Sequence, residues 1–249
     1  MIRRVLSLLT AAVLSLPAYT QSQPADRSWI ATSNGYTNLL IQVEFKHRPE
    51  AASTQGLSEF DNKIAQPTLA DEDQERQETA AVLVKLKSAS AEKQQKEVAQ
   101  DLQIMIRKVE LDFKQQDFAR AHEVPFLNAS AMVFGGLRIL LDEQTPSDRR
   151  PAAVVRIREY AGLDPGYTSI TEILKQRVTE QIAKPGVIYP ARVEIETEMA
   201  RNSNYVDGIS ALMQKYNLTG WQEPFGKLKT QLSDYDAWVR ATVLPKSPN

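Results

Sequence analysis

The chain has 249 residues, of which 42% are hydrophobic and 24% are charged, and its formal net charge is −1. This composition is ordinary for a globular protein and offers no excess of basic residues of the kind that a nucleic-acid partner requires. The absence of cysteine excludes disulfides, thiolate metal ligands, a cysteine nucleophile and a lipid-modified cysteine.

The first twenty residues have the pattern of a secretory signal peptide. Arg3 and Arg4 give a positive start, and an apolar run over 5–16 follows that is too short to span a bilayer comfortably. Small residues precede a cleavage point after Thr20. We predict a signal peptide at 1–20, with a short buried helix as the less favoured alternative. The absence of cysteine and of any later long apolar run then favours a periplasmic or secreted protein without a membrane span.

Beyond the signal peptide, apolar residues recur at helical spacing, and the alternation typical of a strand fails beyond four residues. The sequence therefore predicts an all-α fold, a multi-helical bundle of about eight or nine helices with no sheet. We expect residues 21–249 to form a single helical domain. The predicted helices cover residues 28–47, 49–55, 71–87, 91–121, 132–141, 149–161, 169–182, 189–216 and 221–239.

An acidic cluster opens the third predicted helix, where Asp71, Glu72 and Asp73 are followed by Glu75. Acidic side chains are favourable in a first helical turn because they complement the positive end of the helix dipole. We interpret this cluster as a helix start rather than as a metal or partner site.

The helix predicted over 132–141 is apolar nearly all round, which indicates a central position in the fold. Gly135 and Gly136 lie inside it, and each costs about 1 kcal/mol of helix stability relative to alanine. A close contact with another helix, or a kink, would account for them.

In the segment 149–167 the residue types indicate the local backbone geometry more completely than in any other segment of the chain. A helix ends where Gly162 supplies the left-handed residue of a helix terminus. Pro165 and Gly166 then have the chemistry of a type II turn. A capping box at 169–172 starts the next helix.

The last two predicted helical segments have distinct features. The segment 189–216 has a weak point at 202–204, where two asparagines flank a serine. The final helix places apolar residues from Trp221 to Val239 at alternating spacings of four and three, which is a heptad-like seam.

A zinc-peptidase interpretation is suggested by His122 and Glu123, but zinc binding of that kind needs a second histidine four residues after the first. Position 126 is Phe126, and Pro125 disrupts the helix. A site built from His122, His47 and scattered carboxylates is the weaker alternative to a role in helix capping or at the surface.

A second carboxylate group, Glu194, Glu196 and Glu198, can do acid–base chemistry only if its surroundings separate the pKa values. Arg192 and Arg201 are available as simple ion-pair partners, so we interpret the group as a solvated helix face. The sequence contains no nucleophile-elbow, phosphate-loop or dinucleotide-binding pattern.

Four segments resemble the bacterial family catalogued as domain of unknown function 885. The first is RPEAASTQGLSEFDNK at 48–63, and the second, RRPAAVVRIREYAGLDPGYTSITEILKQRV, begins at Arg149. YPARVEIETEMARNSNYVDGISALMQKY at 189–216 and QLSDYDAWVRATVLPK at 231–246 resemble later blocks. The resemblance extends over most of the chain from Trp29 to Pro245.

This resemblance implies a secreted, mostly helical protein similar to zinc carboxypeptidases, and it covers only the N-terminal half of such proteins. The zinc motif of the family has a form like HE-x-x-PGH and lies in the other half. The HEVPF run at 122–126 is not that motif. We therefore predict no catalytic, cofactor-binding or metal-binding residue in this chain, and we expect zinc only in the C-terminal half.

Three hypotheses for function remain open. In the first, the chain is the non-catalytic half of a metallopeptidase-like protein, inactive alone, with a missing or separately encoded C-terminal half as partner and exposed apolar patches for it, for example along Trp221–Val239. In the second, it is a stand-alone periplasmic binding or scaffold protein. In the third and least favoured, it is an enzyme with an unrecognised carboxylate site.

Overall fold

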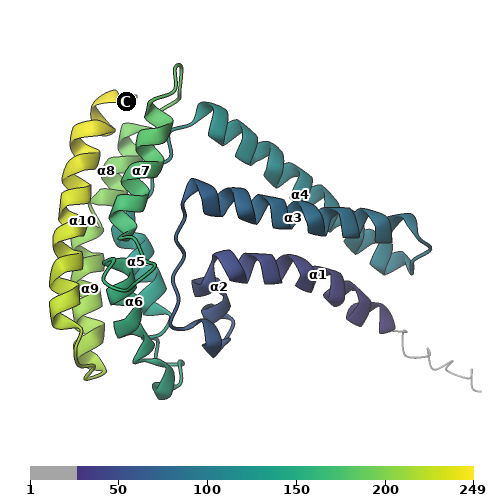
Figure 1. Ribbon diagram of the computed structural model, residues 1–249, viewed down its shortest axis with the longest axis horizontal. Coiled ribbons are helices and arrows are strands. Elements are labelled where there is room, and N and C mark those ends of the chain that lie inside the picture. The colour runs from purple at the N-terminus through teal and green to yellow at the C-terminus, as the bar shows by residue number, and fades with distance from the viewer. Residues whose placement is uncertain (1–26) are drawn as a thin grey trace, which may run out of the picture.

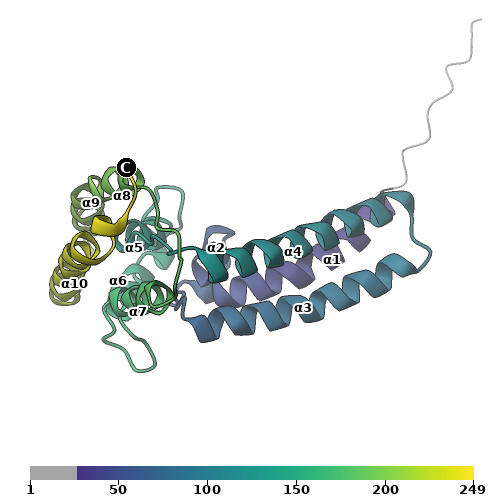
Figure 2. The ribbon, with the colours of Figure 1, turned by 90° about the horizontal axis from the view of Figure 1, so that it is seen from above.

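The computed structural model describes residues 27–249, so the predicted signal peptide, residues 1–20, lies outside the described part of the chain. The helices fall into two groups (Figure 1). The amino-terminal group is an arm of long helices, and the carboxyl-terminal group is a bundle beside it. Seen from above, the arm projects away from the bundle (Figure 2).

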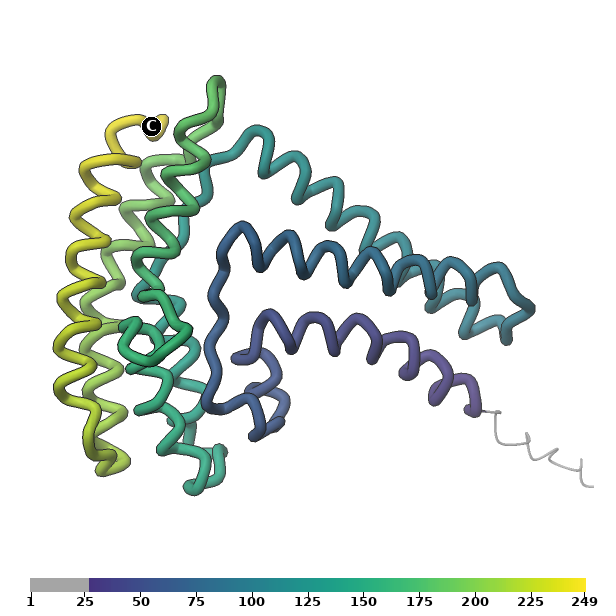
Figure 3. Tube along the Cα trace, viewed as in Figure 1, coloured from purple at the N-terminus to yellow at the C-terminus, as the bar shows by residue number. Residues whose placement is uncertain are grey.

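The arm is made of three long helices, α1 (Ser28–His47), α3 (Leu69–Ala91) and α4 (Lys96–His122). After α1 the chain makes the short helix α2 (Pro49–Thr54) and the 3-10 turn η1 (Ser58–Phe60). An extended segment then leads to the start of α3 (Figure 3). The fully buried side chains that hold the arm together are Val82, Leu86, Ala89, Val98 and Leu102.

The bundle encloses a second and larger hydrophobic core, to which each of its helices contributes buried side chains. Burial of apolar surface is the main stabilising contribution in both cores. The bundle consists of α5 (Ala129–Arg138), α6 (Ala152–Tyr160), α7 (Ile170–Ile182), α8 (Arg192–Met199), α9 (Asn202–Lys215) and α10 (Gln222–Thr242), with 3-10 turns η2 (Ser147–Arg149) and η3 (Leu244–Lys246).

The predicted fold class is confirmed. Over residues 27–249 there is no strand, and one isolated bridge pairs Glu123 with Ile188. None of the helices in this range combines the length and apolar character that crossing a membrane would require.

Helix boundaries differ from the sequence prediction in one informative place. The helix predicted from residue 91 begins at Lys96, because the chain leaves α3 at Glu92 in an extended conformation. The side chain of Gln94 donates to the carbonyl of Ala89 and so takes up a backbone acceptor at the end of α3. The weak point predicted at 202–204 forms the first turn of α9, and the break between α8 and α9 lies just before it, at Ala200 and Arg201.

The predicted seam Trp221–Val239 forms, but it is not an exposed docking surface. The apolar side chains along it are at most 7% exposed, because α10 packs its seam into the core of the bundle. The expectation of an exposed apolar patch along this helix was therefore wrong: its own chain covers it.

The stop after α6 is confirmed in detail. Gly162 has φ +65°, and the amide of Leu163 donates to the carbonyl of Arg158 over 2.9 Å, as in a Schellman motif. Gly166 has φ +87°, and a 3.2 Å hydrogen bond from the amide of Tyr167 closes the predicted turn.

Gly136 makes the close contact with another helix that was predicted for this glycine pair. A Cβ atom placed there would lie 2.1 Å from the phenolic oxygen of Tyr160, on the facing helix α6. Gly135 has no such neighbour, since nothing lies within 4 Å of its Cβ position. Only the second glycine is required by packing.

This difference gives a matched pair of substitutions. We expect Gly136→Ala to lower the free energy of unfolding by about 1–3 kcal/mol, because the buried Tyr160 has to move. Gly135→Ala should raise it by up to about 1 kcal/mol through helix propensity. Denaturant titration followed by circular dichroism measures both. Equal effects of the two substitutions would contradict the contact.

Candidate functional site

The two histidines predicted as weak metal candidates serve other contacts. His47 is buried, with Nδ1 2.8 Å from a carboxylate oxygen of Asp71 and Nε2 3.3 Å from one of Glu78. His122 is exposed and its ring lies 4.9 Å from that of Phe118. Among residues 27–249 no group of three histidine, aspartate or glutamate side chains is arranged to hold a metal ion.

The acidic cluster forms the first turns of α3, as predicted. The Thr68 side chain caps this helix by accepting from the amide of Asp71 over 3.1 Å. The cluster also does something that the sequence did not reveal. Glu72 and Asp73 pair with arginines of other helices, Glu75 pairs with Arg48 between α1 and α2, and all three acids line a pocket.

The second carboxylate group, Glu194, Glu196 and Glu198, lies on α8 and makes weak ion pairs with neighbouring arginines. Arg192 lies 3.8 Å from Glu196, and Arg201 lies 3.5 Å from Glu198. Glu194 and Glu196 are exposed. Surface pairs of this kind contribute little to stability, which agrees with the solvated-face interpretation.

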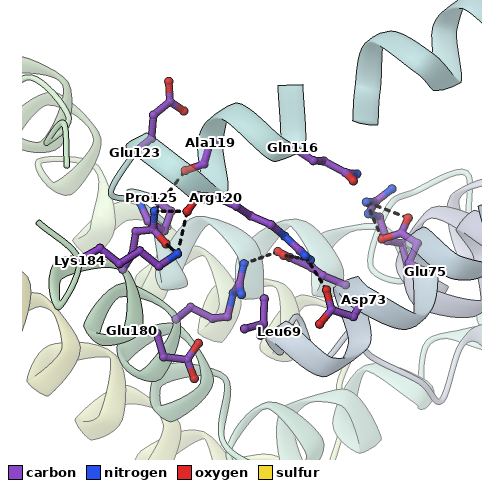
Figure 4. A pocket seen from close by; sticks show the side chains of 14 residues that line it. Leu69, Asp73, Glu75, Gln116, Ala119, Arg120, Glu123, Pro125, Glu180 and Lys184 are labelled. Atoms are coloured by element: carbon purple, nitrogen blue, oxygen red, sulfur yellow. Dashed lines mark hydrogen bonds and ion pairs between the residues drawn. The ribbon is translucent and has the colours of Figure 1, made fainter. Parts of the chain in front are cut away.

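The pocket lies between the arm and the bundle and has a volume of about 570 Å³, within the range of small-molecule sites (Figure 4). Helices α3 and α4 supply half of its lining residues, and α7 supplies the facing side. Its lining residues are Arg48, Leu69, Glu72, Asp73, Glu75, Gln116, Ala119, Arg120, Glu123, Pro125, Arg177, Glu180, Gln181 and Lys184.

Glu72 is at the centre of the charged network in this pocket. One of its carboxylate oxygens accepts from Arg120 of α4 over 3.1 Å, and the other accepts from Arg177 of α7. Arg120 also binds Asp73. This network joins the arm to the bundle. Burial lowers the pKa of Arg120, but the hydrogen bonds that it donates to Asp73 and Glu72 outweigh burial and raise the pKa above its ordinary value.

A separate arginine closes the far side of the pocket. Arg48 lies 3.0 Å from Glu75, and burial raises the pKa of the Glu75 carboxyl despite this partner. No local sequence pattern indicates these pairs, because their members are 27 or more residues apart along the chain.

The two family-like segments 48–63 and 149–167 lie against each other. Arg149 donates two hydrogen bonds of 2.7 Å to the carboxylate of Asp61, and the Ser53 hydroxyl donates to the same carboxylate. Burial raises the pKa of Asp61, but the hydrogen bonds from Arg149 and Ser53 outweigh it and hold the pKa below its ordinary value.

Deeper in the same interface is a buried polar cluster. Glu50 accepts from the amide of Ala65 through both oxygens, at 3.0 and 3.1 Å, and from the Tyr160 hydroxyl at 2.8 Å. Glu159 is 5% exposed, and burial raises the pKa of its carboxyl to about 7. Burial also raises the pKa of its neighbour Tyr167 to about 12.

The raised pKa of Glu159 makes stability depend on pH. The unfolded carboxyl releases its proton near pH 4.5, whereas the folded one keeps it to about pH 7, so this contribution is present at low pH and lost as pH rises. Between pH 5 and pH 8 we expect the wild type to lose about 3 kcal/mol relative to Glu159→Gln, which stays neutral.

Denaturant titrations of both proteins at several pH values measure this difference. Other titrating groups are common to the two proteins and cancel in the comparison. Parallel stability curves from pH 5 to pH 8 would show that the carboxyl is not held protonated.

Comparison with known proteins adds a single relationship. Residues 49–249 match the model of a family described as a bacterial protein of unknown function, DUF885. The matched range begins at α2 and includes the buried polar cluster and every lining residue of the charged pocket except Arg48. No curated protein and no solved structure matches the chain.

Proposed function

The chain belongs to the bacterial DUF885 family, and from that premise we propose that it is the helical, non-catalytic part of an exported zinc metallopeptidase-like protein. The support for zinc chemistry is the sequence resemblance to zinc carboxypeptidases. The family's zinc motif, of a form like HE-x-x-PGH, does not occur in this sequence. The donor set of residues 27–249 does not fit zinc either, so we assign no hydrolytic step to these side chains.

The observation that carries this proposal is an uncovered apolar stripe on α4. Ile104, Leu111 and Phe118 are 58%, 51% and 52% exposed. Seven-residue spacing is close to two helical turns, so the three side chains lie in one row. The row is on the face of α4 opposite to its buried residues, Leu102 and Val109.

A row of large apolar side chains on an exposed helix face is typical of an interaction surface. The flanks of the row are basic, since Arg107 and Lys114 are exposed beside it. We propose that the zinc-motif part of the family packs on this stripe. The stripe therefore takes the place of the Trp221–Val239 seam as the expected contact.

Mixing this chain with a separately produced polypeptide that carries the family's zinc motif tests the proposal. We expect a one-to-one complex by light scattering, and peptide hydrolysis by the zinc-loaded mixture but not by this chain alone. Replacing Leu111 and Phe118 together by glutamate should weaken the complex at least about tenfold, because it buries charge in an apolar contact.

Val84→Glu is the matched control, since Val84 is 65% exposed on α3 and lies outside the stripe. It should leave the affinity unchanged. A complex that tolerates the double substitution, or the absence of any complex, would argue against docking on α4.

The second candidate function is a stand-alone periplasmic binding or scaffold protein. It is favoured by the covered seam of α10, which leaves the bundle core enclosed by its own chain. This second function requires that the purified chain melts in one cooperative transition and does not bind the zinc-motif polypeptide. Light scattering and calorimetry of the same samples separate the two functions.

Export is part of both functions and has its own test. When the full-length chain is expressed in bacteria, we expect the periplasmic fraction to contain a protein that begins at Gln21. Amino-terminal sequencing identifies the cut. Recovery of uncleaved protein in the cytoplasm alone would refute export by this segment.

A further inference from the structure

The charges that line the pocket of Figure 4 are not balanced. Five acidic and four basic side chains line it. The three arginines are all bound to Glu72, Asp73 or Glu75. The charged groups outside these pairs are two glutamates and one lysine: Glu123, Glu180 and Lys184.

Lys184 is committed to the end of α4. Its ammonium donates to the carbonyl of Arg120 over 2.7 Å and to the side-chain oxygen of Gln181 over 2.8 Å. Gln181 in turn donates to the carbonyls of Ala119 and Arg120. Both side chains therefore cap the carboxyl end of α4, where a cation is favoured by the helix dipole.

Only one of the two carboxylate oxygens of Glu180 accepts a hydrogen bond within the described residues. One oxygen accepts from Gln176 over 2.8 Å, whereas Oε2 is shielded from water and has no hydrogen-bond partner among residues 27–249. Lys184 follows Glu180 by four residues but lies beyond the end of α7 at Ile182, and its ammonium binds Arg120 and Gln181 rather than Glu180. Figure 4 accordingly draws no bond from Glu180 to the other lining residues.

An unsatisfied buried carboxylate oxygen costs about 1–3 kcal/mol or more. Oε2 has no exposed surface, so a donor bound in the pocket would stabilise this carboxylate once the Glu180 side chain rotates toward the cavity. The donor that suits a carboxylate is a cation, and the excess of acid in the pocket favours the same charge. Leu69, Ala119 and Pro125 add apolar wall to the cavity.

We propose that this pocket binds a ligand that carries a primary ammonium or a guanidinium on an apolar stem, with Glu180 accepting from the cation. The stem lies against the apolar wall. A lysine or arginine side chain of a peptide has this chemistry, and so does a free polyamine.

Calorimetric titration of the purified full chain tests the site with three probes. They are the blocked tripeptide N-acetyl-Ala-Lys-Ala-amide, its norleucine counterpart without the charge, and spermidine. We expect the lysine peptide or spermidine, or both, to bind, with affinity falling as salt rises, and the norleucine peptide to bind at least about tenfold more weakly. Binding by the peptide alone or by spermidine alone identifies the source of the cation.

Three variants on α7 locate the contact. Glu180→Gln should weaken binding of the cationic probe at least about tenfold, and Glu180→Asp should weaken it less, because it retains the charge. Glu172→Gln removes the same charge from the exposed start of α7 and should have no effect. Melting curves confirm that each variant is folded.

Three results would overturn the proposal. These are no binding by either cationic probe, equal binding by the norleucine peptide, or unchanged affinity in folded Glu180→Gln. The experiment uses this chain alone, so it is independent of docking on α4.

Discussion

The rest of the structure depends on the hydrogen bonds that the buried guanidinium of Arg156 donates to two backbone carbonyls. This side chain is completely buried, and it donates to the carbonyl of Gly136 in α5 and, over 3.3 Å, to that of Phe60. One residue of α6 thus ties together the bundle and the segment that leads into the arm. Burying a guanidinium is unfavourable unless it is hydrogen-bonded, and the Nε of Arg156 has no partner among residues 27–249. The bonds to these two carbonyls are therefore the compensation that the buried charge has, and both carbonyls must stay in place. The position of η1 against the bundle is fixed by this requirement.

The other contacts of this interface build outward from that point. Arg149 and Asp61 fix the same segment from the surface side, and Glu50 with Tyr160 fix the start of α2. Close approach of α5 and α6 is needed for this arrangement, which explains why position 136 has no side chain. The interface between arm and bundle is consequently polar and directional, whereas the core on each side of it is apolar. Such networks favour one arrangement of the two parts, since every unpaired member would be destabilising.

The charged pocket is a consequence of this arrangement. Once the extended segment has placed α3, its acidic first turns face the end of α4 and the middle of α7. Glu72 then meets arginines from both helices. The acids that suit a helix start in an isolated α3 therefore acquire a second role as the wall of a cavity. The outer face of α4 remains uncovered because the arm has only three long helices to enclose its core.

The sequence by itself determined the features that rest on local chemistry. The all-α class followed from apolar periodicity, and the stop at Gly162 followed from the need for a left-handed residue. The sequence segments around α2 and α6 likewise indicated the family to which the chain belongs.

Only the tertiary structure decided which surfaces are covered and which charges meet. The seam of α10 is buried and the row on α4 is exposed, although both are apolar rows on long helices. Periodicity shows that a helix has an apolar face but not whether a neighbour lies against it. The partners of Glu72 lie 48 and 105 residues away, so no local pattern reveals them. The unpaired oxygen of Glu180 is likewise a tertiary feature, and the nearby ammonium of Lys184 binds the end of α4 instead.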